Sequence, residues 1–182
     1  MIITIVILVL ILAWTALTYN SLVKQRNIVK EAWSGIDVQL KRRYDLIPNV
    51  VDAVKGYAGY EKELLQRVTA MRTKTMELNT PGEKVKPESE LSGMLKNLLV
   101  IAENYPDLKA NQNFLNLQNQ LTEVEDQIQY ARRYYNGAVR DYNTKVESFP
   151  SNIMASPLGF KIEEFFEISL ATERETPKVG LT

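Results

Sequence analysis

Two stretches of the sequence concentrate side chains that could do chemistry, and both are rich in arginine. The first stretch, "QLKRRYDLIPNVV" at residues 39–51, contains Arg42, Arg43, Asp45, Pro48 and Asn49. The second stretch, "ARRYYNGAVRDYN" at residues 131–143, contains Arg132, Arg133, Tyr135, Asn136, Arg140 and Asp141. Guanidinium groups bind carboxylates and phosphates through paired hydrogen bonds, so this pattern suits a site for an anion or an acidic partner. A structural network with solvated charges around it is the competing interpretation, because charged side chains beside a helical seam usually have that role.

The residue types that most enzymes and metal sites use are missing. The chain contains no histidine and no cysteine, although histidine is the usual general base near neutral pH and a common metal ligand. Di-iron bundles present carboxylates and histidines from several facing helices, whereas Glu123, Glu125 and Asp126 are grouped on one segment. The sequence also contains no glycine-rich phosphate loop and no nucleophile elbow. We therefore expect no cofactor, no metal and no enzymatic activity.

Net charge and length narrow the class of protein further. Lysine and arginine total 22, and aspartate and glutamate also total 22, so the formal net charge is zero. A neutral chain has no overall attraction to a phosphate backbone, and we expect no nucleic-acid partner. A chain of 182 residues suits one folded domain and an additional segment.

That additional segment is an apolar run at the N-terminus, "IITIVILVLILAWTAL", from Ile2 to Leu17. Sixteen helical residues span about 24 Å, and Thr18 and Tyr19 bring the rod close to the ~30 Å of a bilayer core. A cleaved signal peptide would need a basic start and a small-x-small cleavage site, which this run does not provide. We predict a transmembrane anchor over residues 1–18 that contacts the lipid bilayer through residues 2–18.

Positive charges follow the anchor closely. Lys24, Arg26 and Lys30 lie within the first turns after the apolar run, and no charged side chain precedes it. The positive-inside rule therefore predicts that the C-terminal domain faces the cytoplasm.

The two arginine-rich stretches lie on two long predicted helices. Apolar residues recur at spacings of three and four in both segments, which is typical of helices that pack along a seam. The helix over residues 19–58 has the seam Val29, Trp33, Ile36, Leu40, Tyr44, Ile47, Val51 and Val54. The helix over residues 111–149 has the seam Phe114, Leu117, Leu121, Val124, Ile128, Ala131, Tyr135, Ala138 and Tyr142.

Pro48 interrupts the first helix chemically, because it lacks the backbone N–H that would bond the carbonyl group four residues earlier. The apolar stripe keeps its phase across it, so we predict a continuous, kinked helix. The charged and amide residues of this stretch flank the predicted stripe. They could bond the groups that the kink frees or reach across to the last helix.

Two shorter helices are predicted between the long ones, separated by the linker "TPGEKVKP" and followed by "NYPDLKAN". Short connections make neighbouring helices antiparallel. The predicted fold is therefore all-α, with an N-terminal transmembrane helix followed by an antiparallel four-helix bundle of two long and two short helices over residues 19–149. In that arrangement Arg132 and Arg133 reach roughly the level of Arg42 and Arg43.

The short helices cover only the half of the long pair that is remote from the membrane. The membrane-proximal half must be covered either by the tail or by a second copy of the chain. Ser156 and Pro157 resemble a helix start, so we predict a short amphipathic helix within the C-terminal segment 150–170. Residues 171–182 are polar and without periodicity, which predicts disorder.

The chain resembles the LemA family of bacterial membrane proteins. The matching segments are residues 19–61, 131–143 and 149–160, the last being "FPSNIMASPLGF", together with the apolar N-terminal helix. The resemblance implies a single-pass protein of the bacterial cell membrane with an antiparallel four-helix bundle, and it supplies no catalytic residues. A magnetosome membrane-formation protein is similar to this family, which favours a role in membrane organisation.

These observations predict a non-enzymatic, membrane-anchored scaffold that self-associates and takes part in membrane or envelope organisation. Its partners would be a second copy of the chain, another membrane protein, or both. An adaptor or regulator of another membrane complex, such as a quality-control protease, is the alternative. A third possibility is an enzyme or anion-binding protein that relies on arginines and carboxylates alone.

Overall fold

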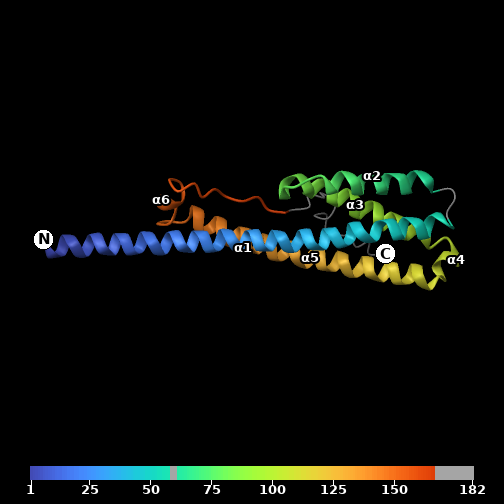
Figure 1. Ribbon diagram of the computed structural model, residues 1–182, viewed down its shortest axis with the longest axis horizontal. Coiled ribbons are helices and arrows are strands. Elements are labelled where there is room, and N and C mark those ends of the chain that lie inside the picture. Colours follow the sequence, from blue (N-terminus) through green and yellow to red (C-terminus); the bar gives the residue numbers. More distant parts are fainter. Residues whose placement is uncertain (58–60, 167–182) are drawn as a thin grey trace, which may run out of the picture.

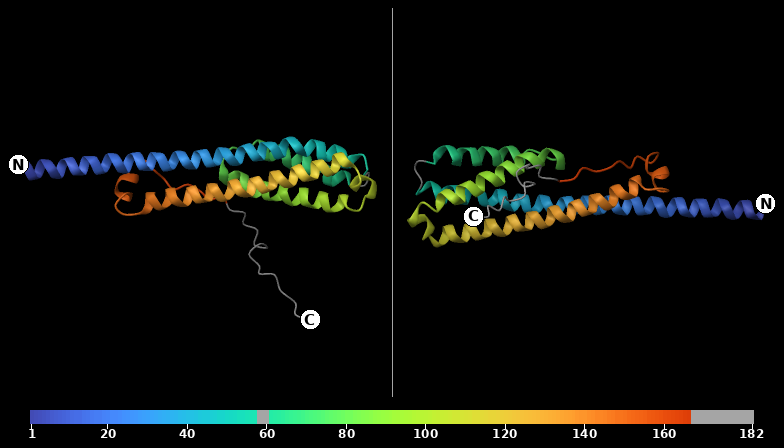
Figure 2. Two further views of the ribbon diagram at one scale, coloured as in Figure 1. Left: turned by 90° about the horizontal axis from the view of Figure 1, so that it is seen from below. Right: turned by 180° about the vertical axis from the view of Figure 1, so that it is seen from behind.

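The computed structural model describes residues 1–57 and 61–166, and these residues form helices and connecting segments without a β-strand. The helices are α1 (Ile2–Lys55), α2 (Lys62–Met76), α3 (Pro81–Ala102), α4 (Pro106–Lys109), α5 (Gln112–Glu147) and α6 (Asn152–Ala155). The long helices α1 and α5 run antiparallel to each other, and the molecule is a rod with the N-terminus at one tip (Figure 1; Figure 2). The predicted fold class, a long apolar N-terminal helix with a bundle of long and short helices, is confirmed.

Helix α1 unites two segments that the sequence pattern distinguished, the anchor and the first helix of the bundle. It is a single helix of 54 residues, or about 80 Å. Among the described residues, α1 is the one helix that is long and apolar enough to cross a membrane. The helix continues through Pro48, as the unbroken apolar phase predicts. It ends at Lys55, before the predicted end at Ala58, which lies outside the described residues.

The start of α3 differs from the prediction. Its first residue, Pro81, lies inside the segment 80–87 that we predicted as a linker. Thr80 and Glu83 form a capping box: the Thr80 hydroxyl accepts from the Glu83 N–H (3.4 Å), and the Glu83 carboxylate accepts from the Thr80 N–H (3.2 Å). Hydrogen bonds from the side chain and backbone of Thr80 lower the pKa of the Glu83 carboxyl below its usual value. Proline is well suited to the first turn, where its missing N–H would be unbonded in any case.

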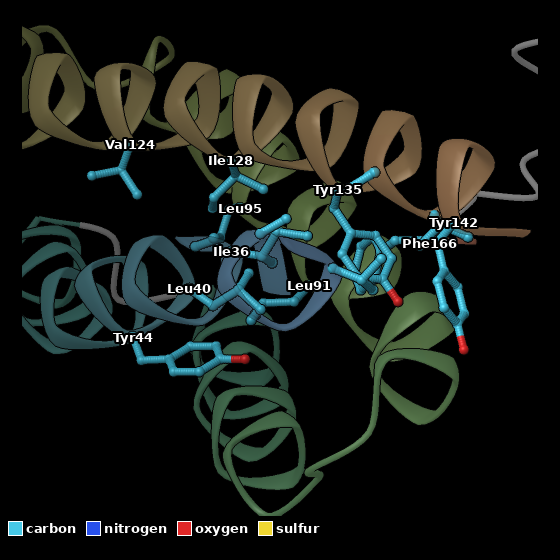
Figure 3. Packing of buried hydrophobic residues seen from close by; sticks show 14 of the residues in the cluster. Ile36, Leu40, Tyr44, Leu91, Leu95, Val124, Ile128, Tyr135, Tyr142 and Phe166 are labelled. Carbon is cyan, nitrogen blue, oxygen red and sulfur yellow. The ribbon is translucent and has the colours of Figure 1, made fainter. Parts of the chain in front are cut away.

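The core lies along the seam between α1 and α5, and α2 and α3 cover only its half remote from the N-terminus (Figure 1). Figure 3 shows buried side chains from α1, α3 and α5 meeting in one cluster, for example Ile36, Leu91 and Ile128. A second cluster at the remote end joins these helices to α2 and α4 through Val50, Leu65, Leu98, Leu108 and Phe114. Burial of this apolar surface is the main force that holds the rod together.

The C-terminal segment covers the other half of the seam. Residues 160–166, which we call the strap, are extended and lie along the two long helices (Figure 1). The Phe160 and Phe166 side chains are buried in the core cluster. Of the two covers that the sequence left open, the tail is therefore the one found within a single copy of the chain.

The predicted helix beginning at Ser156 is wrong. The helix of this segment is α6, Asn152–Ala155, and Ser156 is its C-terminal cap. Gly159 has a positive φ of 74°, a conformation that ends a helix and that glycine adopts without steric cost. The last α5 residue is Glu147 rather than Phe149. Residues 171–182, predicted to be disordered, lie outside the described residues.

Candidate functional site

The first arginine-rich stretch holds a buried ion-pair network centred on Arg43. The Arg43 side chain is fully buried, with 0% exposure, so the prediction that it flanks the apolar stripe is wrong. Its Nη2 pairs with the Glu88 carboxylate of α3, and its Nη1 lies 2.9 Å from Oε2 of Glu125 on α5. Nη1 also donates to the Ser92 hydroxyl at 2.7 Å. One guanidinium group thus joins α1, α3 and α5.

The network extends to α2 through the backbone defect at Pro48. Because Pro48 has no N–H, the carbonyl group of Tyr44 lacks its usual partner within the helix. Nε of Arg72, on α2, donates to this carbonyl oxygen at 2.6 Å. The Tyr44 hydroxyl in turn donates to the buried Glu88 carboxylate. The carbonyl group that Pro48 leaves without a partner within α1 is therefore bonded by α2. The residues that surround Pro48 in the sequence do not supply this bond.

Glu88, Ser92 and Arg72 belong to this network but are not among the predicted site residues. A signal for Glu88 existed, because the α3 seam extends backwards from Leu91 at spacings of three and four to Glu88 and Lys84, and both are buried. A charged residue at a seam position indicates a buried partner. Arg72 carries no such sequence signal, since its partner is a backbone carbonyl group on another helix.

The second arginine-rich stretch binds the backbone of the strap. The Asn136 side-chain amide donates to the Phe166 carbonyl at 3.2 Å, and its oxygen accepts from the Phe166 N–H at 2.8 Å. Asn143 makes the same pair of bonds with Glu163, both at 2.9 Å. Asn136 and Asn143 are seven residues apart on α5, which is a rise of about 10.5 Å along the helix. Their partners Phe166 and Glu163 are three residues apart on the extended strap, which is about 10 Å. The two spacings match, so both asparagines can bond the strap backbone.

Aromatic and cationic groups complete the attachment of the strap. The Tyr135 hydroxyl donates to the Glu164 carbonyl at 2.9 Å, and burial, with Glu163 and Glu164 nearby, raises the pKa of Tyr135 to about 12. The buried Arg132 guanidinium carbon lies 4.9 Å from the centre of the Phe166 ring, within the range of a cation–π contact. Trp33 of α1 packs against the Phe166 ring from the other helix, with centroids 5.8 Å apart.

The two stretches do not form one site. Arg43 faces Glu125 while Trp33 faces Tyr135, so Arg132 lies about two turns, or 10 Å, along the bundle from the level of Arg43. The prediction that four guanidinium groups share one level is therefore wrong. The remaining candidates are exposed, namely Arg42, Asp45, Pro48, Asn49, Arg133, Arg140 and Asp141.

Two of these exposed candidates pair with each other. Arg140 and Asp141 form an ion pair at 3.1 Å on the surface of α5. The Arg133 guanidinium lies over the ring of Tyr130, with its carbon 4.6 Å from the ring centre. Exposed contacts of these kinds contribute little to stability.

A shallow cleft opens over the Arg43 network between α3 and α5. Its volume is about 430 Å³, and Ser92, Lys96, Leu121 and Glu125 are among the residues that line it. The Glu125 side chain is 32% exposed, so water reaches one edge of an otherwise buried network. Within residues 1–57 and 61–166, no group of three or more acidic side chains is placed to hold a metal ion.

In a comparison with known protein families, the LemA family model matches residues 32–180, a range that contains both networks. The chain belongs to the LemA family. Protein LemA of Metamycoplasma hominis is 29% identical over 153 residues, covering 82% of this chain and 69% of that protein. Magnetosome protein MamQ 2 of Paramagnetospirillum magneticum is 23% identical over 193 residues, covering 92% and 71%. Magnetosome protein MamQ of Magnetospirillum gryphiswaldense is 21% identical over 190 residues, covering 90% and 70%.

The family resemblance noted from the sequence is thus confirmed, and the structure gives its two central segments distinct tasks in this LemA-family chain. Residues 39–51 contain the ion-pair centre that joins α1 to the short helices and α5. Residues 131–143 contain the groups that hold the strap. The arginines that we considered as an anion site are, where buried, engaged with the protein itself.

Proposed function

We propose that this LemA-family protein is a membrane-anchored helical scaffold that self-associates, organises the membrane or envelope, and has no catalytic activity of its own. The continuity of α1 carries this proposal. Its apolar first part and its buried later part form one helix, Ile2–Lys55. A bundle attached in this way is joined to the anchor without a hinge and projects about 55 Å beyond it.

The state of the buried charges supports a structural role. Glu88 and Glu125 supply the negative charge that Arg43 requires, and Arg132 packs against the Phe166 ring. Arg43 therefore needs no anionic substrate to compensate its charge. The magnetosome proteins among the relatives support a role in membrane organisation.

A surface for self-association is available on α5. Tyr130 and Tyr134 are 61% and 58% exposed and lie one turn apart on the same face of the helix. Tyrosine is enriched at protein interfaces because its ring is large, rigid and amphipathic. The strap already covers the seam of the long helices, so we assign self-association to this pair rather than to the seam.

Energy transfer between copies in vesicles tests self-association. The chain has no cysteine, so Lys109→Cys at the remote end takes a single donor or acceptor dye. We expect transfer that persists when labelled full-length protein is diluted tenfold with lipid, and that Tyr130→Ser/Tyr134→Ser reduces to the level of random mixing. Val100→Ser, an exposed apolar residue on α3, is the matched control and should keep the transfer. Transfer that falls in proportion to the dilution would overturn the proposal.

We also propose that the bundle faces the cytoplasm, since Lys24, Arg26 and Lys30 follow the anchor. The Lys109→Cys variant tests this in intact cells. A membrane-impermeant maleimide should label it only after lysis, and labelling before lysis would reverse the orientation.

A further inference from the structure

The corner between α5 and the strap, residues 148–159, exposes apolar side chains that the core does not use. Phe149 is 80% exposed, Ile153 58% and Leu158 44%. Elsewhere in this segment Ala155 is buried against the core, so the corner is folded and not merely open. Three large apolar side chains exposed within ten residues of a folded segment suit a partner that removes them from water.

The corner packs against the end of the apolar stretch of α1. Pro150 and Ser151 line a hollow whose opposite wall includes Trp14 and Leu17. Ser21 and Lys145 also line this hollow and tie α1 to the end of α5, because Lys145 Nζ donates to the Ser21 hydroxyl. Figure 1 and Figure 2 show α6 beside α1, at the end of the bundle that points toward the N-terminus. The corner therefore lies level with the last residues of the predicted anchor.

The length of the anchor puts this level at the bilayer surface. A hydrocarbon core of about 30 Å takes about 20 helical residues, whereas the uncharged run from Ile2 to Leu17, in which threonine is the one polar residue type, provides sixteen. No charge appears until Lys24. A bilayer centred on the anchor thus ends near residues 18–21, where the corner is attached.

The charges of the corner suit the same location. Between residues 148 and 162 the one charged side chain is Lys161, and the nearest acidic residues are Glu147 and Glu163 at its two ends. Lys145 lies beside the corner on α5. An apolar surface without an acidic side chain of its own can enter the headgroup region without burying a negative charge.

We propose that this corner is a second membrane contact, in which Phe149, Ile153 and Leu158 insert at the boundary of headgroups and acyl chains in the bilayer that α1 crosses. The inference rests on the proposed anchoring of α1 and adds a surface to it. Attachment at two points fixes the tilt and the rotation of the bundle, whereas one helix alone leaves the rotation free. A scaffold in the plane of the membrane then presents the same face of α5 from every copy.

Spin-label accessibility in vesicles tests the contact. Full-length single-cysteine variants Ile153→Cys and Leu158→Cys are labelled with a nitroxide and reconstituted in vesicles of phosphatidylcholine and phosphatidylglycerol. We expect both labels to be several-fold more accessible to oxygen, which concentrates in lipid, than to a water-soluble nickel complex. Leu10→Cys in the anchor and Val100→Cys at the remote end are the lipid and water references. Adding Phe149→Ser to the variants should shift the corner labels toward the water reference.

The outcomes separate this proposal from the anchoring on which it rests. Corner labels that behave like Val100→Cys, while the Leu10→Cys label lies in lipid, would overturn the second contact and leave the anchor intact. Corner labels shielded from both reagents would mean that a protein neighbour covers the corner, and would also overturn the proposal. A Leu10→Cys label exposed to the nickel complex would refute the anchor itself.

Discussion

Replacing Arg43 by methionine is the sharpest perturbation of the bundle. The substitution keeps the length of the side chain and removes the charge that compensates Glu88, whose side chain is 0% exposed. Removing one partner of a buried ion pair costs about 3–5 kcal/mol, because the other charge stays buried without compensation. Glu125 adds little to this cost, since its side chain is partly exposed and water can take over. We expect the free energy of unfolding to fall by about 3–5 kcal/mol.

Denaturant unfolding of the full-length protein in micelles, followed by far-ultraviolet circular dichroism, measures this change as a shift of the midpoint. Arg42→Met is the matched control. Arg42 is the neighbouring arginine and is exposed, so its loss should change the free energy of unfolding by no more than about 0.5 kcal/mol.

A double variant distinguishes a buried charge from a simple loss of packing. Arg43→Met/Glu88→Leu removes both charges and continues the apolar seam of α3, so it should be more stable than Arg43→Met alone by about 2 kcal/mol or more. The Tyr44 hydroxyl then lacks its acceptor, which leaves a residual cost of about 1 kcal/mol. A loss below about 1 kcal/mol for Arg43→Met, or additive effects of the two substitutions, would refute this reasoning.

Three further predictions concern the strap and the proline. Asn143→Ala removes two bonds to the strap backbone, at a cost of about 1–3 kcal/mol, and should speed proteolysis and amide exchange within residues 160–166; unchanged exchange would contradict the assignment. Arg72→Met should destabilise the protein by about 1–3 kcal/mol, and much less in a Pro48→Ala background, where the helix bonds its own carbonyl group; equal losses in both backgrounds would argue against that role. Because the pKa of Tyr135 is raised from 10.0 to about 12, its contribution to stability is complete below pH 10 and lost as the pH rises through 12. The tyrosinate absorbance that Tyr135→Phe removes should therefore titrate near pH 12, and a midpoint near 10 would contradict the burial argument.

The helices could be predicted from the sequence because each one buries a stripe of apolar residues. The spacing of that stripe can be recognised within a single segment of the chain. Ile36, Leu40 and Ile47 follow that spacing. The unbroken phase of the stripe predicts that α1 continues through Pro48, as the structure shows. The burial of Arg43 was not predicted. Residues 43 and 44 both fit the spacing, and an apolar criterion selects the tyrosine although both side chains are buried.

The strap could not be predicted from local signals. Ser156 and Pro157 have the chemistry of a helix start, yet the segment that follows is extended because side chains on α5 bond its backbone. Those bonds link residues 20 and 30 positions apart. The match between a helix repeat of seven residues and an extended repeat of three becomes visible only once the two segments lie side by side.

The continuity of α1 is the central claim, and a distance between two spin labels tests it most directly. Nitroxides at Leu10→Cys and Val38→Cys in full-length protein in vesicles bracket the junction between the anchor and the bundle. A single helix over 28 residues predicts a narrow distance distribution centred near 42 Å. A broad distribution, or a centre well below this value, would show a hinge at the membrane surface and contradict a rigidly mounted scaffold.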